Sequence, residues 1–298
     1  MSVQTLRKKV VSKQKKSVGK KYTKFRPQIK SRHPSHSILR TDLKLLPFRS
    51  IVRLGSTTVM RDGFPRIECN SVQSVRNSAN KLLMKECFME LDIKTAIWWT
   101  TTDGRNFNSN NMEESQVSVN TLEFPIVAKH IFGSRGTGNT LLKSKLELDS
   151  WLIGKTLNRY IFESFYSYSR EYRLHVTKDG VIYTCRKMLK EDTPENDRWY
   201  RNDSNSVWIL ESNIMFDKPL NWDNIVNESI KALDAVGLDI GAVDVKVQSR
   251  TTKKGKIREN PEFIILEINS APSFGELTSK VYLEEIPKIL TKKYESIH

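Results

Sequence analysis

An α+β protein is the fold class that the sequence predicts, and two kinds of periodicity carry this expectation. Polar and apolar residues alternate along residues 241–247 and 263–269, as expected for strands with one buried face. Apolar residues recur at helical spacing along residues 72–87 and 222–236. The 298 residues allow one large domain or two to three small ones, with a sizeable hydrophobic core.

The positive charge of the chain is concentrated at its N-terminus. Residues 1–41 contain thirteen Lys and Arg and no Asp or Glu, whereas the remainder is close to neutral. Few apolar residues and no sustained periodicity predict a flexible, disordered basic arm there. We expect the arm to attract nucleic acid or another polyanion, because released counterions favour binding. A solubilising tail and an organelle transit peptide are the alternatives.

Composition argues against a membrane protein and against a zinc site. No apolar run approaches the length of a membrane span, and no secretory signal is evident. The three cysteines are widely spaced, which fits a reduced compartment and offers no zinc-binding pattern. We therefore expect a cytoplasmic protein with no membrane partner.

A small α/β domain is expected at residues 42–102. Residues 50–54 have the composition of a short strand, and the helix of residues 72–87 follows. The tryptophan pair at residues 98–99 is expected to close this unit. Residues 100–120 are polar and rich in Asn and Ser, which predicts a linker.

Several basic residues of the first half are candidates for binding an anion. Arg53 lies in the first strand and Lys81 on the polar side of the helix, where Lys85 also lies without being a candidate. Lys129 lies in the strand predicted for residues 124–131. For each residue taken alone, a solvated surface position is the simplest interpretation.

A glycine-rich loop follows that strand. Gly133, Gly136 and Gly138 fall within six positions, together with Ser134. Glycines let backbone N–H groups turn towards a phosphate, because no Cβ interferes. The spacing matches neither a Walker A loop nor a dinucleotide-binding fingerprint. An ordinary hairpin turn would also explain the loop.

Three further strands are predicted along residues 159–165, 169–176 and 181–187, the last two joined by an Asp-Gly turn. Their charged residues are candidates for a site, although the solvated face of a two-sided strand would explain each one singly. The candidates are Glu163, Glu171, Arg173, Arg186 and Lys187.

The two strands at residues 241–247 and 263–269 form the predicted hairpin that carries the strongest signal. Alternation places Asp244 on the polar face of the first strand, and Glu267 and Asn269 on the polar face of the second. Carboxylate and amide oxygens suit magnesium held together with a nucleotide. The residues expected to face the core from the second strand are Ile264, Leu266 and Ile268.

Leu266-Glu267-Ile268-Asn269-Ser270-Ala271-Pro272 resembles the metal-binding strand of the ATP-grasp superfamily, in which Glu-x-Asn is followed by small residues and proline. Asp244 falls where that family has its other metal carboxylate. The resemblance covers residues 48–290, and the nearest pattern is that of the glutamate-ligase-like members of ribosomal-protein type, including virus-encoded ones. It implies an ATP-grasp domain at residues 121–298, made of subdomains 121–180 and 181–298 that grip ATP. A viral origin would imply the host-cell cytoplasm.

The resemblance also implies roles for individual residues. Asp244, Glu267 and Asn269 would bind Mg²⁺, with Mn²⁺ as an alternative. Lys81, Lys129 and Lys187 (or Arg186) would contact the phosphates of ATP, as would the loop of Gly133, Ser134, Gly136 and Gly138. Adenine would lie against Glu163, Ser164 and Phe165, and the ribose against Glu171. The residues expected to orient a substrate carboxylate are Arg173 and Arg53.

The activity implied is that of an ATP-dependent carboxylate–amine ligase, which forms an amide or peptide bond through an acyl phosphate and releases ADP and phosphate. Its acid and amine substrates would be small molecules, peptides or proteins. A phosphotransferase on the same fold is one alternative, and a nucleic-acid-binding protein with a retired ATP-grasp domain is the other. Polar residues 190–206 resemble the mobile loop over the triphosphate, and we make no prediction for Arg198, Arg201 and Asn202 within it.

Overall fold

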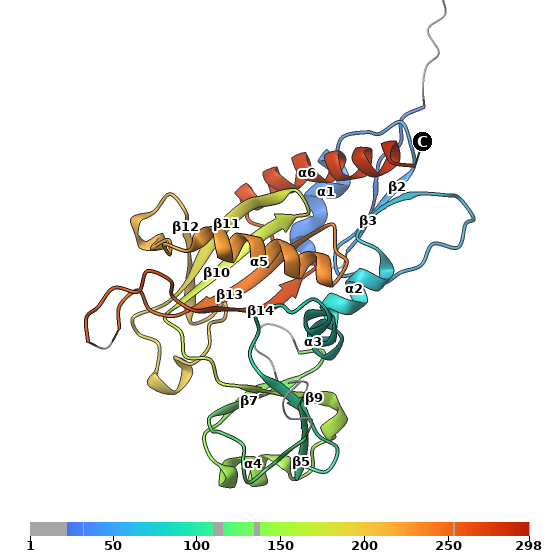
Figure 1. The fold of residues 1–298 in the computed structure, drawn as a ribbon. Coiled ribbons are helices and arrows are strands. Elements are labelled where there is room, and N and C mark those ends of the chain that lie inside the picture. The colour runs from blue at the N-terminus through green and yellow to red at the C-terminus, as the bar shows by residue number, and fades with distance from the viewer. Residues whose placement is uncertain (1–22, 32, 110–115, 134–137, 253, 298) are drawn as a thin grey trace, which may run out of the picture.

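The structure is a computed structural model that describes residues 23–31, 33–109, 116–133, 138–252 and 254–297 (Figure 1). Within these residues the strands form three sheets of three, five and six strands. The six-stranded sheet forms a lobe of its own, at the bottom of Figure 1, and the five-stranded sheet lies above it. No helix in the described part of the chain is long and apolar enough to cross a membrane.

The six-stranded sheet is antiparallel, with the order β6-β5-β4-β9-β7-β8. Helix α4 (Lys145–Leu152) covers it, and Phe107, Phe162 and Leu148 are fully buried between them. The strands are β4 (Trp98–Thr100), β5 (Asn106–Ser109), β6 (Gln116–Ser118), β7 (Ile126–His130), β8 (Asn139–Leu142) and β9 (Tyr160–Ser164).

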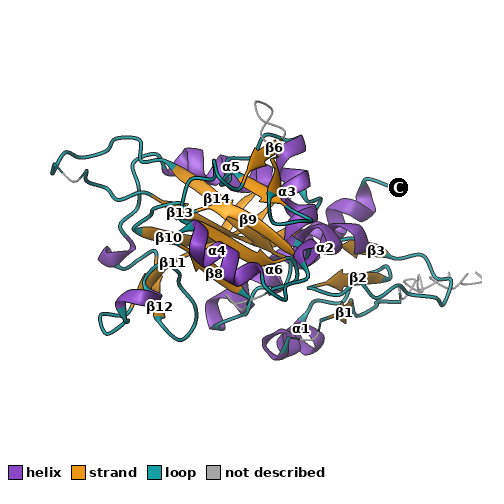
Figure 2. Ribbon diagram, turned by 90° about the horizontal axis from the view of Figure 1, so that it is seen from below, coloured by secondary structure: helices purple, strands orange, loops and turns teal. Residues whose placement is uncertain are grey.

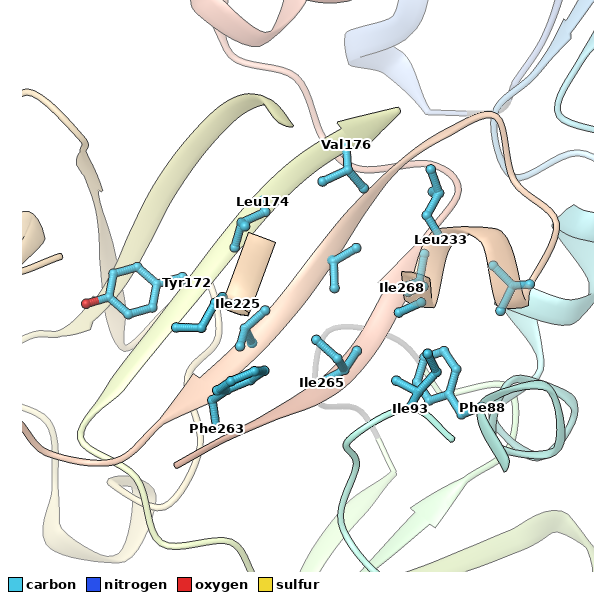
Figure 3. Packing of buried hydrophobic residues seen from close by; sticks show 14 of the residues in the cluster. Phe88, Ile93, Tyr172, Leu174, Val176, Ile225, Leu233, Phe263, Ile265 and Ile268 are labelled. Carbon is cyan, nitrogen blue, oxygen red and sulfur yellow. The ribbon is translucent and has the colours of Figure 1, made fainter. Parts of the chain in front are cut away.

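The five-stranded antiparallel sheet has the order β12-β11-β10-β13-β14. Its apolar face packs against α5 (Trp222–Ala235) and α3 (Lys81–Glu90), as Figure 3 shows for Leu174, Ile225 and Ile265. Its other face carries the polar side chains considered below. The strands are β10 (Arg170–Thr177), β11 (Gly180–Leu189), β12 (Ser206–Leu210), β13 (Ile240–Val247) and β14 (Phe263–Asn269).

The third sheet is a small parallel one at the N-terminal side, set apart from the others in Figure 2. It consists of β1 (Gln28–Lys30), β2 (Ser50–Arg53) and β3 (Ile67–Cys69). Helices α1 (Ser37–Asp42) and α6 (Glu276–Glu295) share its apolar core, in which Leu39, Val52 and Tyr282 are fully buried. The C-terminal helix therefore closes the N-terminal unit.

The basic arm is shorter than the predicted range of residues 1–41. Residues 1–22 lie outside the described part, but β1 pairs with β2, and α1 buries Leu39. The imidazole of His36 is also buried and bonds to the carbonyl of Pro272 at 2.7 Å. These contacts order residues 28–31 and 33–42, although their sequence shows no periodic pattern that would have predicted it.

Three other predicted features of the domain organisation differ in the structure. Residues 98–99 do not close the N-terminal unit, because β4 pairs with β9 of the six-stranded sheet. The predicted linker at residues 100–120 contains β5 and β6, which extend that same sheet. The border between the predicted subdomains moves from 180/181 to the segment between β9 and β10, because β10 and β11 pair within the five-stranded sheet.

The helix predicted for residues 72–87 is two helices, α2 (Val72–Ala79) and α3. Asn80 lies between them in an extended conformation, and its side chain accepts hydrogen bonds from the N–H groups of Leu82 and Leu83. This is the arrangement of an N-cap residue. It places Lys81 at the first position of a new helix.

Candidate active site

A cavity lies between the six-stranded and the five-stranded sheets. Lys129 and Glu163 line it from the first sheet, and Glu171, Arg173 and Asp244 line it from the second. The segment after β9 and the loop before β12 also contribute to the wall, with Phe165, Tyr166, Tyr168, Trp199, Tyr200 and Arg201.

The polar face of the five-stranded sheet is organised as two rows that run across the strands. Opposite residues in the first row are Glu267, Asp244 and Arg173. The second row runs from Lys246 through Glu171 and Lys187 to Trp208. Directly opposite residues share a face, as do residues two apart on one strand, so both rows face the cavity. The predicted common face of Asp244, Glu267 and Asn269 is therefore confirmed.

The prediction for the apolar residues of β14 was partly wrong. Asp244 pairs with Glu267, but Val245 pairs with Ile265, which leaves Leu266 as an extra residue in a β-bulge. Ile265 and Ile268 consequently enter the core, whereas Ile264 and Leu266 line the cavity. The bulge keeps Glu267 facing the site although its spacing from Ile264 is odd.

The acidic end of the cavity is held by a bidentate ion pair. Arg173 donates from Nε and Nη2 to the two oxygens of Asp244, at 2.6 and 2.7 Å. Burial alone would lower the pKa of Arg173, but Asp244 outweighs it and raises that pKa. The amide nitrogen of Asn269 lies 3.4 Å from Asp244 Oδ2 and 3.3 Å from Glu267 Oε1. The three predicted metal ligands therefore converge.

The donor set of this end fits a hard cation. Burial would raise the pKa of Glu267, but Lys81 and Lys129 dominate and lower it, so the carboxylate is ionised. Lys81 Nζ lies 3.7 Å from Glu267 Oε2. Two carboxylates and one amide oxygen are ligands that Mg²⁺ accepts. Arg173 engages both oxygens of Asp244, and each oxygen keeps a further lone pair with which Asp244 can reach a metal.

Glu163 of the six-stranded sheet lies between two lysines. Its oxygens are 2.5 Å from Lys129 Nζ and 3.1 Å from Lys85 Nζ. Burial would raise the pKa of Glu163, but the two lysines outweigh it and hold the pKa at about 2. Lys85 was predicted on a polar surface and is in fact fully buried, and burial lowers its pKa to about 8. Lys85 can be buried on α3 because the carboxylate of Glu163 compensates its charge.

Ser164 and Phe165 line the cavity as predicted, but their backbone donors are already engaged. The N–H of Ser164 bonds to the carbonyl of Ile97 at 2.9 Å, and that of Phe165 to Pro125 at 3.1 Å. These two N–H groups are therefore not available to pair with the edge of an adenine ring. The sheet pairing that positions Glu163 uses them instead.

Glu171 has cations on both sides. Lys187 Nζ lies 3.9 Å from one oxygen and Arg201 Nη1 3.8 Å from the other. Burial raises the pKa of Glu171, with Lys187 and Lys246 opposing it. Arg186, the alternative to Lys187, faces the other side of the sheet and donates to the carbonyl of Met215 at 2.7 Å. Lys187 is therefore the cation of β11 that lines the cavity.

The remaining predicted residues divide into three groups. Arg53 does not line the cavity; its guanidinium pairs with Glu68 at 2.9 Å in the N-terminal unit. The carbonyl of Gly133 accepts a hydrogen bond of 2.5 Å from Lys81, which ties the glycine-rich loop to α3. Gly138 has φ +79°, a conformation that favours glycine. Ser134 and Gly136 lie outside the described residues.

The structure adds cavity residues that the sequence did not single out. The ring centroid of Tyr168 lies 4.2 Å from Lys246 Nζ and 4.4 Å from the guanidinium carbon of Arg201. Burial lowers the pKa of Lys246 to about 8. Its spacing of two from Asp244 was a usable signal, whereas nothing in the pattern marked Tyr168. His33 also lines the cavity, from a segment that was expected to be flexible.

Comparisons with known proteins support the fold. No protein-family model and no curated protein matches the sequence. Among solved structures, D-alanine–D-alanine ligase from Bacillus anthracis matches with a TM-score of 0.54 and 16% identity, covering 77% of this chain and 73% of that one. The same ligase from Coxiella burnetii gives 0.52 and 13%, covering 78% and 62%.

A third structure, carboxyaminoimidazole ribonucleotide synthase from Aspergillus clavatus complexed with ATP, gives a TM-score of 0.50 and 16% identity. It covers 74% of this chain and 53% of that one. These structural neighbours are ATP-grasp enzymes, and the chain has the ATP-grasp fold. At such identities the likeness concerns the fold.

Proposed function

We propose that the chain is an ATP-dependent carboxylate–amine ligase that works through an acyl phosphate and releases ADP and phosphate. One observation carries the proposal: three cations and three oxygen donors line a single cavity between the two sheets of an ATP-grasp fold. These residues are Lys81, Lys129, Lys187, Asp244, Glu267 and Asn269. Such an arrangement suits a magnesium-bound triphosphate.

Within this proposal the lysines neutralise the phosphates of ATP, and Lys81 does so from the first turn of α3. Asp244, Glu267 and Asn269 would hold Mg²⁺ or Mn²⁺, which when bound neutralises the charge of the phosphate oxygens. Glu171, flanked by Lys187 and Arg201, would accept hydrogen bonds from the ribose hydroxyls. Glu163 sets the positions of Lys85 and Lys129.

The acid substrate needs positioning and no base. A carboxylate is ionised at neutral pH, so its oxygen attacks the γ-phosphate directly while the bond to ADP breaks. Arg173 is the proposed group that orients this carboxylate: Asp244 engages its Nε and Nη2, which leaves Nη1 to donate. The amine then attacks the carbonyl carbon of the acyl phosphate, and phosphate leaves.

Trapping with hydroxylamine tests the proposal. The protein is incubated with MgATP, hydroxylamine and a panel of carboxylic acids, and the products are separated by mass spectrometry. A hydroxamate formed together with ADP and phosphate supports the ligase. A phosphorylated product that hydroxylamine leaves intact identifies a kinase, and AMP with pyrophosphate contradicts both reactions.

A further inference from the structure

The outer strand of the five-stranded sheet, β12, presents an apolar edge. It pairs with β11 on one side, and the described residues place no strand on its other side. The side chains of Val207, Trp208 and Leu210 are each 39% exposed, and Ile214 just beyond the strand is 95% exposed. Proteins usually protect such edges with charges or proline, so an apolar edge indicates a partner.

The backbone groups that face this edge follow from the ladder. The N–H of Lys190 bonds to the carbonyl of Asn205, and these residues lie directly beyond the paired Leu189 and Ser206. Because hydrogen-bonded and non-bonded pairs alternate in an antiparallel ladder, Val207 and Ile209 bond to β11. The N–H groups of Ser206, Trp208 and Leu210 therefore point away from the sheet.

The edge is continuous with the cavity. Trp208 is opposite Lys187 in the second polar row, so its indole lies on the face of the sheet that lines the site. The centroid of its indole ring lies 4.8 Å from the guanidinium carbon of Arg173 and 5.1 Å from Lys187 Nζ. A strand added to β12 would lie about 10 Å from β11, since adjacent strands are about 4.8 Å apart. A chain leaving that strand over Trp208 reaches the proposed reaction centre within a few residues.

We propose that β12 binds an extended segment of a polypeptide substrate as an added strand, and that the chain next to this segment carries the reacting group into the cavity. This inference rests on the proposed ligase function and names its substrate class. Backbone N–H and C=O groups at the open edge recognise another extended backbone, and the exposed apolar side chains select apolar residues at alternate positions. A second copy of this chain would cover the edge without delivering a group to the site.

Leu210→Pro tests the backbone contact, with Leu210→Val as its control. Proline removes the outward N–H of Leu210 but keeps the carbonyl that accepts from Asn213 at 3.0 Å. The ladder to β11 stays intact, because proline is tolerated on an edge strand when its nitrogen faces solvent. Valine keeps the N–H and a smaller apolar side chain. The two variants therefore separate the loss of a backbone donor from the loss of the leucine side chain.

The probe is a phage-displayed library of random nine-residue peptides, followed by fluorescence anisotropy with the selected peptides in synthetic form and without ATP. We expect apolar residues at alternate positions, and binding about fivefold or more weaker to Leu210→Pro than to Leu210→Val. Failure to select any peptide, or equal binding by the two variants, overturns the proposal. So does a dimer of the natural chain in light scattering that Leu210→Pro dissociates.

Peptide binding and ligation fail independently in this design. Because the anisotropy is measured without ATP, a selected peptide that binds β12 but yields no hydroxamate with any acid contradicts the ligase function alone. A hydroxamate formed from small acids, with no peptide bound at β12, contradicts the substrate class alone.

Discussion

Glu267 is the side chain that most directly tests the proposed metal site. It is ionised, opposite Asp244 and 3.7 Å from Lys81, so Glu267→Gln removes a charge while preserving shape. We expect ADP release to fall by about 100-fold or more at saturating Mg²⁺. The melting temperature should change by less than about 2 °C, because the side chain is partly exposed. Near-normal turnover would remove Glu267 from the site.

Lys187 and Arg186 are adjacent on β11 and face opposite sides of the sheet. Lys187→Met should raise the KM for ATP about tenfold or more, because it removes a cation from the cavity. Arg186→Met should leave this KM within about twofold and lower the melting temperature, because the bond to Met215 is lost. Steady-state kinetics and calorimetry on both variants check the pair. A larger KM effect for Arg186→Met would reverse the orientation of β11.

Alternation along strands was sufficient to predict which residues share the acidic end of the site. Asp244, Glu267 and Asn269 followed from a period of two, and the structure brings them together. The same rule failed at Leu266, because a β-bulge adds a residue and nothing in the local composition announces it. Lys85 was equally hidden, since its burial depends on Glu163, 78 positions later in the chain.

The contact between β10 and α6 predicts a pH-dependent stability. His175 of β10 bonds through Nδ1 to the hydroxyl of Tyr282 at 3.1 Å, and burial, with Arg173 adding to it, lowers the pKa of His175 to about 3. The pKa is lower in the folded state than in the unfolded state, so the stabilisation is fully present above about pH 6.5 and is lost as pH falls towards 3. The expected slope is at most about 1.4 kcal/mol per pH unit.

Urea unfolding between pH 8 and pH 5 measures this slope. His175→Gln keeps a neutral side chain that can bond to Tyr282 and does not titrate, so its free energy of unfolding should depend less on pH than that of the natural chain. Equal slopes for the two proteins would show that His175 is not the titrating group.

Sequence periodicity predicted whether a segment is a helix or a strand better than it predicted which elements pair or pack together. Helix α5 and strands β13 and β14 lie where periodicity placed them. The β5–β6 hairpin escaped notice because its strands are short and polar, and only Phe107 is fully buried among their described side chains. The break at Asn80 depends on a capping side chain, which a hydrophobic pattern does not register.

Across the whole molecule, the positive charge is concentrated in residues 1–41, and the remainder is nearly neutral. Residues 1–22 contain eight Lys and Arg and no acidic residue. We expect that deleting residues 1–22 weakens binding to RNA or DNA and flattens its salt dependence, while ATP turnover stays within about twofold. Deleting residues 1–41 should also lower the melting temperature, because β1 and the buried Leu39 and His36 are lost.

Filter binding across a salt series, with calorimetry on both deletions, checks this division. If the full chain binds nucleic acid undetectably or without salt dependence, the basic segment does not serve to bind nucleic acid. Equal melting temperatures for the two deletions would contradict the packing of α1 against α6.

The resemblance in sequence led to the correct fold, because its motifs occur in order along most of the chain. It could not supply the packing of the N-terminal unit, in which Arg53 pairs with Glu68 outside the cavity while His33 lines it. Those positions arise from contacts between segments far apart in the chain. The proposed function depends on one chemical step, in which a carboxylate oxygen attacks the γ-phosphate of ATP in this cavity.

Oxygen transfer measures that attack directly. An acid that yields a hydroxamate is labelled with ¹⁸O in its carboxylate and incubated with the protein, MgATP and an amine acceptor. Mass spectrometry then follows the label in the released phosphate. An acyl phosphate transfers one ¹⁸O per amide formed, because the bond that breaks in the second step joins the carbonyl carbon to that oxygen. Unlabelled phosphate, or label in AMP, would contradict attack by the carboxylate on the γ-phosphate.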